Sequence, residues 1–181
     1  MLVIIAARGG SKGLKDKNII NLNRKPLIAH TIESALKAKK VSRVIVSTDS
    51  LKIAKISKKY GAEVPFLRPK KLSNSNSNIL LAYKHALNFL KKKGDYFREF
   101  VALGSSCPLR LPKDIDNCID LFYKTKSLTL LSIKENDKPI QWILKKTDKN
   151  KIIKYTKSKK FLNRQEYEKT YIPNGSIYIF N

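Results

Sequence analysis

The chain has 181 residues, with 38 Lys and Arg against 14 Asp and Glu, so its formal net charge is +24 at pH 7. This length predicts one domain with a single core. A hydrophobic content of 42% excludes a disordered basic tail. The sequence has no run of 18 apolar residues, so we expect no membrane-spanning segment. Cys107 and Cys118 are too few for a disulfide framework or a zinc site, so we expect a reducing, cytoplasmic compartment.

The positive charge is mostly lysine, with 31 Lys and seven Arg spread along the chain. Proteins that read nucleic acids usually depend on Arg for bidentate contacts with phosphate and guanine. Lys and Asn share A-rich codons, and thirteen Asn accompany the lysines. We therefore interpret the positive charge chiefly as a result of codon composition, with a preference for anionic partners, such as nucleotides, acidic sugars or a membrane surface, as the alternative. A basic nucleic-acid binder is disfavoured.

Apolar runs alternate with helical periodicity along most of the chain. The pattern predicts helices within 27–36, 51–60, 79–90 and 115–122, and strands over 2–6, 44–47, 63–66, 100–103, 128–133 and 176–180. This alternation is typical of βαβ units, so we predict a Rossmann-like three-layer α/β/α fold with a mostly parallel sheet. Ligands bind such sheets beyond the carboxyl ends of the strands.

Residues 134–170 interrupt this rhythm with a polar, Lys-rich stretch. We predict a single domain over 1–181, in which 134–170 is an excursion from the sheet. Two interpretations stay open: a flexible insert, or an arm that packs on a partner subunit.

The first expected strand leads into a loop with three glycines, Gly9, Gly10 and Gly13. Glycines let backbone N–H groups approach an anion closely, and Arg8, Lys12 and Lys17 add positive charge. The spacing matches neither the Walker loop nor the dinucleotide-binding GxGxxG pattern. The loop therefore predicts a polyphosphate site of another kind.

Several segments together resemble one family. They are IIAARGGSKGLKDKNI, KPLIAHTIESAL, RVIVSTDS, AEVPFLRPKKLS, SSCPLR and NRQEYEKTYIPNGSIYI, in this order over the whole chain. The combination resembles the acylneuraminate cytidylyltransferases, whose nucleotidyltransferase fold carries a dimerisation-type insertion. The resemblance implies transfer of CMP from CTP to a 2-keto nonulosonic acid of the sialic or legionaminic type, with release of pyrophosphate. It also implies Mg²⁺ and a homodimer.

The resemblance implies roles for individual residues. Arg8 and Lys12 would be the catalytic cations on the β- and γ-phosphates, with Ser11 beside them. The other implied CTP contacts are Lys17, Asn18, Arg68 and Ser77, the last within the segment 75–78 beside the base. On the sugar side the resemblance implies Arg110, Gln165, Asn174 and Gly175. Asp49 is interpreted as a helix cap. The alternative is a carboxylate that takes the place of the family's metal-binding aspartates, which this sequence lacks. His30 and His85 are interpreted as structural.

The chain departs from the family pattern at several places, among them Ser75 where an Asp is usual and Ile172 where an Arg is common. The usual LQPTSPLR is here LGSSCPLR, so Gly104 replaces a substrate-binding Gln. Members usually continue past the final strand to an Asp-x-Asp pair that carries Mg²⁺, whereas this sequence stops at Asn181, so no metal ligand is assigned. We interpret this as truncation or loss of the pair. The alternatives are a catalytically impaired nucleotide-binding module and a cytidylyltransferase for eight-carbon keto-deoxyoctulosonate.

Overall fold

The computed structural model describes residues 1–10, 13–74, 77–156 and 163–181. The chain divides into two compact units, residues 1–131 with 175–181, and residues 132–174. The first unit contains β1 (Leu2–Ala6), η1 (Lys17–Ile19), β2 (Asn21–Leu22), β3 (Lys25–Pro26), α1 (Leu27–Lys37), β4 (Arg43–Ser47), α2 (Leu51–Lys59), η2 (Lys70–Leu72), α3 (Ile79–Lys92), β5 (Phe100–Leu103) and α4 (Pro112–Thr125). Strand β6 (Thr129–Glu135) begins in this unit, and strand β9 (Tyr171–Phe180) ends in it.

The main sheet has five strands in the order β4-β1-β5-β9-β6. Strand β1 pairs in parallel with both β4 and β5, and β9 pairs antiparallel with β5. The expected sheet is thus confirmed as α/β with a parallel core, but it is mixed. The register opposes Ala6 to Ser47 and Ile5 to Leu103, so the carboxyl ends of three parallel strands meet at one edge.

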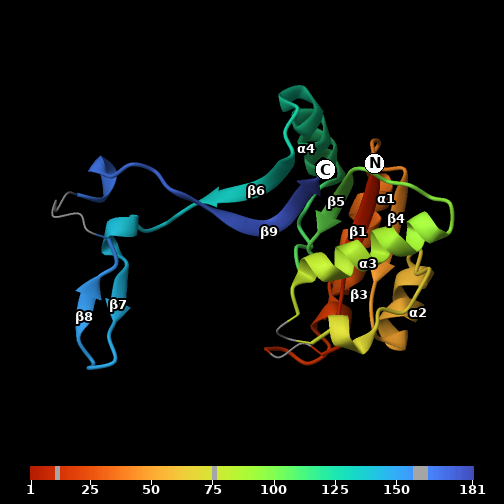
Figure 1. The fold of residues 1–181 in the computed structure, drawn as a ribbon, viewed down its shortest axis with the longest axis horizontal. Coiled ribbons are helices and arrows are strands. Elements are labelled where there is room, and N and C mark those ends of the chain that lie inside the picture. Colours follow the sequence, from red (N-terminus) through yellow and green to blue (C-terminus); the bar gives the residue numbers. More distant parts are fainter. Residues whose placement is uncertain (11–12, 75–76, 157–162) are drawn as a thin grey trace. The chain divides into compact units, whose positions relative to one another are not determined.

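Helices cover both faces of this sheet, because successive side chains of a strand point to opposite faces. On one face, α1, α2 and α4 pack on alternate residues of the strands, including Val3, Val44 and Val101. On the other face, α3 packs on the intervening residues, including Ile4 and Ile45. Figure 1 shows α3 crossing in front of the strands. Within the described residues, no helix has the length and apolar character needed to cross a membrane.

Two expected strands differ in the structure. Residues 63–66 form no strand; only isolated bridges occur here, Ile45 with Glu63 and Thr48 with the following Leu67. Pro65 lies between the two bridges and has no N–H to donate, so the ladder is interrupted there. The last strand, expected over 176–180, is longer and begins at Tyr171.

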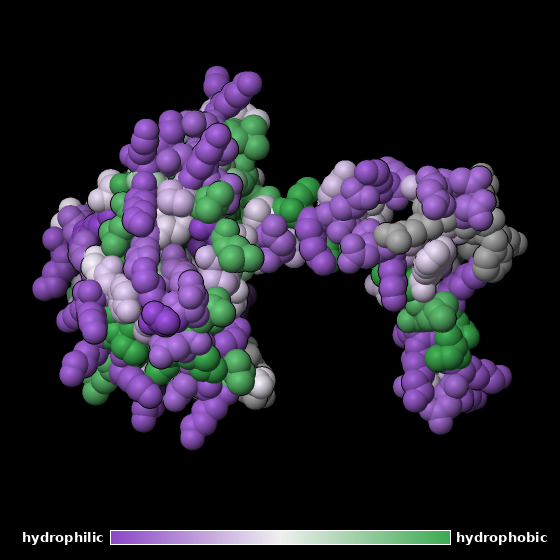
Figure 2. Space-filling model, turned by 180° about the vertical axis from the view of Figure 1, so that it is seen from behind, coloured by the Kyte–Doolittle hydropathy of each residue, from purple (hydrophilic) through white to green (hydrophobic). Residues whose placement is uncertain are grey.

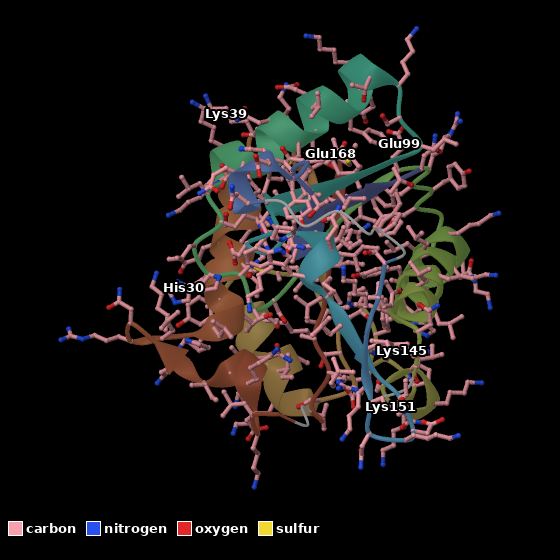
Figure 3. All side chains as sticks on the ribbon, turned by 90° about the vertical axis from the view of Figure 1, so that its left-hand side faces the viewer. His30, Lys39, Glu99, Lys145, Lys151 and Glu168 are labelled. Atoms are coloured by element: carbon pink, nitrogen blue, oxygen red, sulfur yellow. The ribbon has the colours of Figure 1, made fainter. Side chains whose placement is uncertain are left out.

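The second unit contains the expected excursion. It includes η3 (Ile140–Trp142), the antiparallel hairpin of β7 (Leu144–Lys146) and β8 (Ile152–Lys154), and η4 (Arg164–Glu166). Figure 3 labels Lys145 and Lys151 on this hairpin. Every residue of β7 and β8 is exposed within the chain, apolar ones included.

Candidate active site

A cleft of about 460 Å³ lies at the carboxyl edge of the sheet, beside the loop that follows β1. Five residues singled out in the sequence line it, namely Arg8, Lys17, Asn18, Arg68 and Ser77. They come from three separate segments: the loop after β1, the Arg-Pro segment and the residues before α3. The structure therefore brings most of the expected nucleotide contacts of its described part into one cavity.

The cleft has further lining residues that the sequence analysis did not assign. They are Ala6, Gly13, Leu14, Leu72, Ser73, Asn74, Ile79, Ala82 and Ser105. Most lie within a few positions of an assigned residue, so proximity along the chain was the available signal. Ser105 follows β5 directly, and the rule that ligands bind beyond the strand ends points to it.

Arg68 is the most deeply buried cation of the cleft, with 6% of its surface exposed. Its Nε donates a hydrogen bond to Ser73 Oγ at 2.9 Å, and its Nη2 lies 3.9 Å from Asp49 Oδ1. Burial lowers the pKa of Arg68 below its usual value; Asp49 opposes this shift and Arg8 adds to it. Two cations that repel each other in a partly desolvated cleft favour an anionic ligand.

Asp49 does not cap the helix after β4, contrary to one interpretation of the sequence. Ser50 is the N-cap of α2, and its hydroxyl accepts a hydrogen bond from the Ile53 N–H. Asp49 Oδ1 instead accepts the Gly9 N–H at 3.0 Å. The carboxylate therefore ties the turn after β4 to the glycine loop after β1.

Ser11 and Lys12 lie outside the described residues, as do Ser75 and Asn76. Their roles stay predictions. Ser77 is described: its Oγ donates to the Lys71 carbonyl at 3.0 Å, which closes the segment between η2 and α3.

Arg110 lies beneath the loop after β5 rather than in the wall of the cleft. Its Nη2 donates to the carbonyls of Gly104 and Ser176, both at 2.8 Å, and its Nε donates to Ser176 Oγ at 3.0 Å. Burial lowers its pKa, and the neighbouring Cys107 opposes that shift. The guanidinium thus connects the loop to β9.

The remaining expected sugar contacts fall in different units. Gly175 is in the first unit, with φ +74°, and its carbonyl accepts a bond from Cys107 Sγ at 3.7 Å. Gln165 and Asn174 belong to the unit 132–174, where Asn174 donates to the Ile133 carbonyl. Their roles toward a sugar stay predictions.

The two histidines do not line the cleft. His30 Nε2 lies 2.9 Å from the Leu22 carbonyl and so joins α1 to the β2–β3 hairpin (Figure 3). His85 packs edge-on against the Phe66 ring. These contacts agree with the structural roles expected for both.

The described residues do not fit a Mg²⁺ site. No three His, Cys, Asp or Glu side chains within the described ranges are grouped to hold a metal ion. Asp49 already accepts the Gly9 amide and faces Arg68. Mg²⁺ remains an expectation from the family, and no step below is derived through it.

Gly104 has a steric reason to be glycine. A Cβ at this position would meet the carbonyl oxygen of Gly175 well inside van der Waals contact. We expect Gly104→Ala to lower the free energy of unfolding by about 1–3 kcal/mol, because backbone on both sides must shift. Urea denaturation measures this. Gly10→Ala is the matched control, since a Cβ there meets no atom of the described residues within 4 Å, and it should not destabilise the chain. Equal stability of both variants would contradict the close approach.

Known proteins resemble this chain in sequence over nearly all of its length. The sequence profile of a family described as "Cytidylyltransferase" matches residues 2–95. The chain is 36% identical to CMP-N,N'-diacetyllegionaminic acid synthase of Campylobacter jejuni, covering 99% of the chain and 77% of that protein. It is 30% identical to pseudaminic acid cytidylyltransferase of C. jejuni, covering 98% and 76% respectively. The chain belongs to the cytidylyltransferase family. The resemblance inferred from the sequence is thereby confirmed, and the protein is a nucleotidyltransferase.

The fold of this cytidylyltransferase is also similar to that of a solved structure. That protein is CMP:2-keto-3-deoxy-manno-octonic acid synthetase, with a TM-score of 0.70 and 18% identity, covering 99% of this chain and 73% of that one. At this identity the match shows the fold alone.

Proposed function

We propose that this cytidylyltransferase transfers CMP from CTP to a 2-keto nonulosonic acid. The observation that carries the proposal is the cleft that holds Arg8, Lys17 and Arg68 beside a glycine-rich loop. The names of the two Campylobacter relatives, which specify legionaminic and pseudaminic acid derivatives, support a nonulosonic substrate.

In the proposed reaction, the anomeric hydroxyl of the sugar forms a bond with the α-phosphorus of CTP. The bond from that phosphorus to the bridging oxygen breaks, pyrophosphate leaves, and the hydroxyl proton is released. Negative charge grows on the leaving group, so cations near the outer phosphates stabilise the transition state. Arg8 and Lys12 are the proposed cations. Arg68 and Ser77 are proposed for the base, and Lys17 and Asn18 for the region of the triphosphate and ribose.

CTP is expected to protect the fold against heat, while ATP and single-stranded DNA are not. At a hundredfold excess over its Kd, a ligand stabilises the native state by about 2.7 kcal/mol, or roughly 5–10 °C in Tm for this chain length. Differential scanning fluorimetry measures this. Protection by single-stranded DNA instead would favour the basic nucleic-acid binder and refute the proposal.

A pyrophosphate-release assay identifies the sugar and tests turnover. Legionaminic, pseudaminic and sialic acids are compared with keto-deoxyoctulosonate, each with CTP. Release of pyrophosphate with a nine-carbon acid supports the proposal. Release with the eight-carbon acid alone would show that the substrate is keto-deoxyoctulosonate and not a nonulosonic acid. CTP binding without any release indicates the nucleotide-binding module that was the alternative expectation.

We further propose that residues 1–181 form one domain whose excursion dimerises. Exposed apolar side chains on the unit 132–174 support this, namely Trp142, Leu144, Ile152, Ile153 and Tyr155. Figure 2 shows a group of hydrophobic side chains on this unit. Sedimentation should give a dimer at micromolar concentration. Leu144→Lys with Ile152→Lys should give a monomer; a wild-type monomer would refute the proposal.

A further inference from the structure

One peptide group of the glycine loop is held from both sides. The carbonyl of Arg8 and the N–H of Gly9 belong to the same peptide group. The Arg8 carbonyl accepts a hydrogen bond from Asn18 Nδ2 at 2.9 Å, and the Gly9 N–H donates to Asp49 Oδ1 at 3.0 Å. The orientation of this peptide plane is therefore determined by two side chains, one ten residues further along the same loop and one from the turn after β4.

The Asn18 side chain is itself fixed by Ser105. Ser105 Oγ donates to Asn18 Oδ1 at 2.7 Å, and both residues are buried, with 8% and 5% of their surface exposed. A carbonyl only accepts hydrogen bonds, so the Asn18 amide must turn its NH₂ toward Arg8 and its oxygen toward Ser105. Without the Ser105 hydroxyl this buried oxygen would lack the donor it has here.

We propose that Asp49 and Ser105 are positioning residues for nucleotide binding, and this proposal rests on the proposed function. Asp49 accepts the hydrogen bond of the Gly9 N–H. Ser105 holds the Asn18 amide, which in turn donates to the Arg8 carbonyl. Together they hold the backbone of Arg8 so that its side chain lies in the cleft before the nucleotide arrives. Such preorganisation raises affinity because less conformational freedom is lost on binding.

These hydrogen bonds on the Arg8–Gly9 peptide, here called the clamp, also limit which N–H groups of the loop can bind a phosphate. The Gly9 N–H is used by Asp49, so it is not available to an anion. Any amide donor to a phosphate is therefore another N–H of the loop. In the motif LQPTSPLR the position of Ser105 is a proline, which has no hydroxyl, so the bond to Asn18 belongs to this chain's own version of the loop.

Calorimetry with CTP and with CMP on the full chain tests the proposal. Ser105→Ala should weaken CTP binding about fivefold, the effect of losing one neutral hydrogen bond, and CMP binding less than twofold. Ser105→Thr keeps a hydroxyl and should restore CTP affinity. Asp49→Ala should weaken CTP binding about tenfold, because its acceptor is charged, whereas Asp49→Asn keeps an oxygen acceptor and should retain most of the affinity.

A double-mutant cycle separates positioning from general stability. If Ser105 acts on Arg8, Ser105→Ala should add nothing to the loss of CTP affinity already caused by Arg8→Ala. Ser127→Ala is the matched control, since it removes a hydroxyl contact of equal length, 2.7 Å to Thr125 Oγ1, away from the cleft. It should leave both affinities unchanged.

The outcomes are distinct. Additive losses in the cycle, or equal losses for CTP and CMP, would overturn the positioning role while leaving the proposed function intact. A wild-type chain that binds neither nucleotide would refute the proposed function, and the clamp with it. Should Asp49→Ala fail to fold, the Ser105 variants and their cycle decide the matter alone.

Discussion

Arg8→Ala is expected to weaken CTP binding about ten- to a hundredfold, the cost of losing charge-assisted hydrogen bonds, while CMP binding changes little. The physical reason is the place of Arg8 in the cleft and its proposed contact with the outer phosphates, which CMP lacks. Isothermal calorimetry with both nucleotides measures the difference.

Arg98→Ala provides the control for the loss of a cation. Arg98 is exposed just before β5, at the opposite end of that strand from the cleft, and its Nε donates to Asn181 Oδ1. Both nucleotides should bind this variant as they bind the wild type. Equal losses for CTP and CMP in Arg8→Ala would place Arg8 away from the outer phosphates and contradict the proposed assignment.

Arg110→Met is expected to lower the free energy of unfolding by about 3 kcal/mol, or roughly 6–12 °C in Tm. The change removes three hydrogen bonds from a buried guanidinium and leaves the Gly104 and Ser176 carbonyls without these donors. Methionine retains much of the side-chain volume, so the loss reports the polar contacts. Chemical denaturation measures it.

Arg110→Lys provides the conservative comparison. A lysine keeps the charge but not the planar fork that reaches both carbonyls and the Ser176 hydroxyl, so it should recover less than half of the lost stability. Full recovery by lysine would show that charge, rather than the geometry of the guanidinium, joins the loop to β9.

Much of the fold follows from local patterns in the sequence. The continuous apolar run over 2–6 predicts a buried strand, because such strands face helices on both sides, and β1 has those bounds. The periodicity before Gly61 and Gly94 predicts two helices, and α2 and α3 lie there. The position of the glycine loop after the first strand, and with it that of Arg8 at the cleft, follows from the same regularity.

Other features depend on contacts between residues far apart in the chain. Strand β9 lies between β5 and β6 and runs antiparallel to β5, so the last strand in sequence is not at the edge of the sheet. Gly104 departs from the family motif, and its reason is the close approach of Gly175, about seventy positions further on. A local pattern carries no information about such a neighbour.

The sequence by itself therefore determines the class of fold, most of the elements and the segments that meet at the carboxyl edge, since apolar periodicity and turn residues act over a few positions. Only the tertiary structure decides how the Arg8–Gly9 peptide is held. Asn18 and Asp49 bond to it directly, and Ser105 holds Asn18; the three residues come from separate segments. A hydrogen bond between distant segments depends on how the strands are ordered and packed, and that order is decided by burial of the whole core.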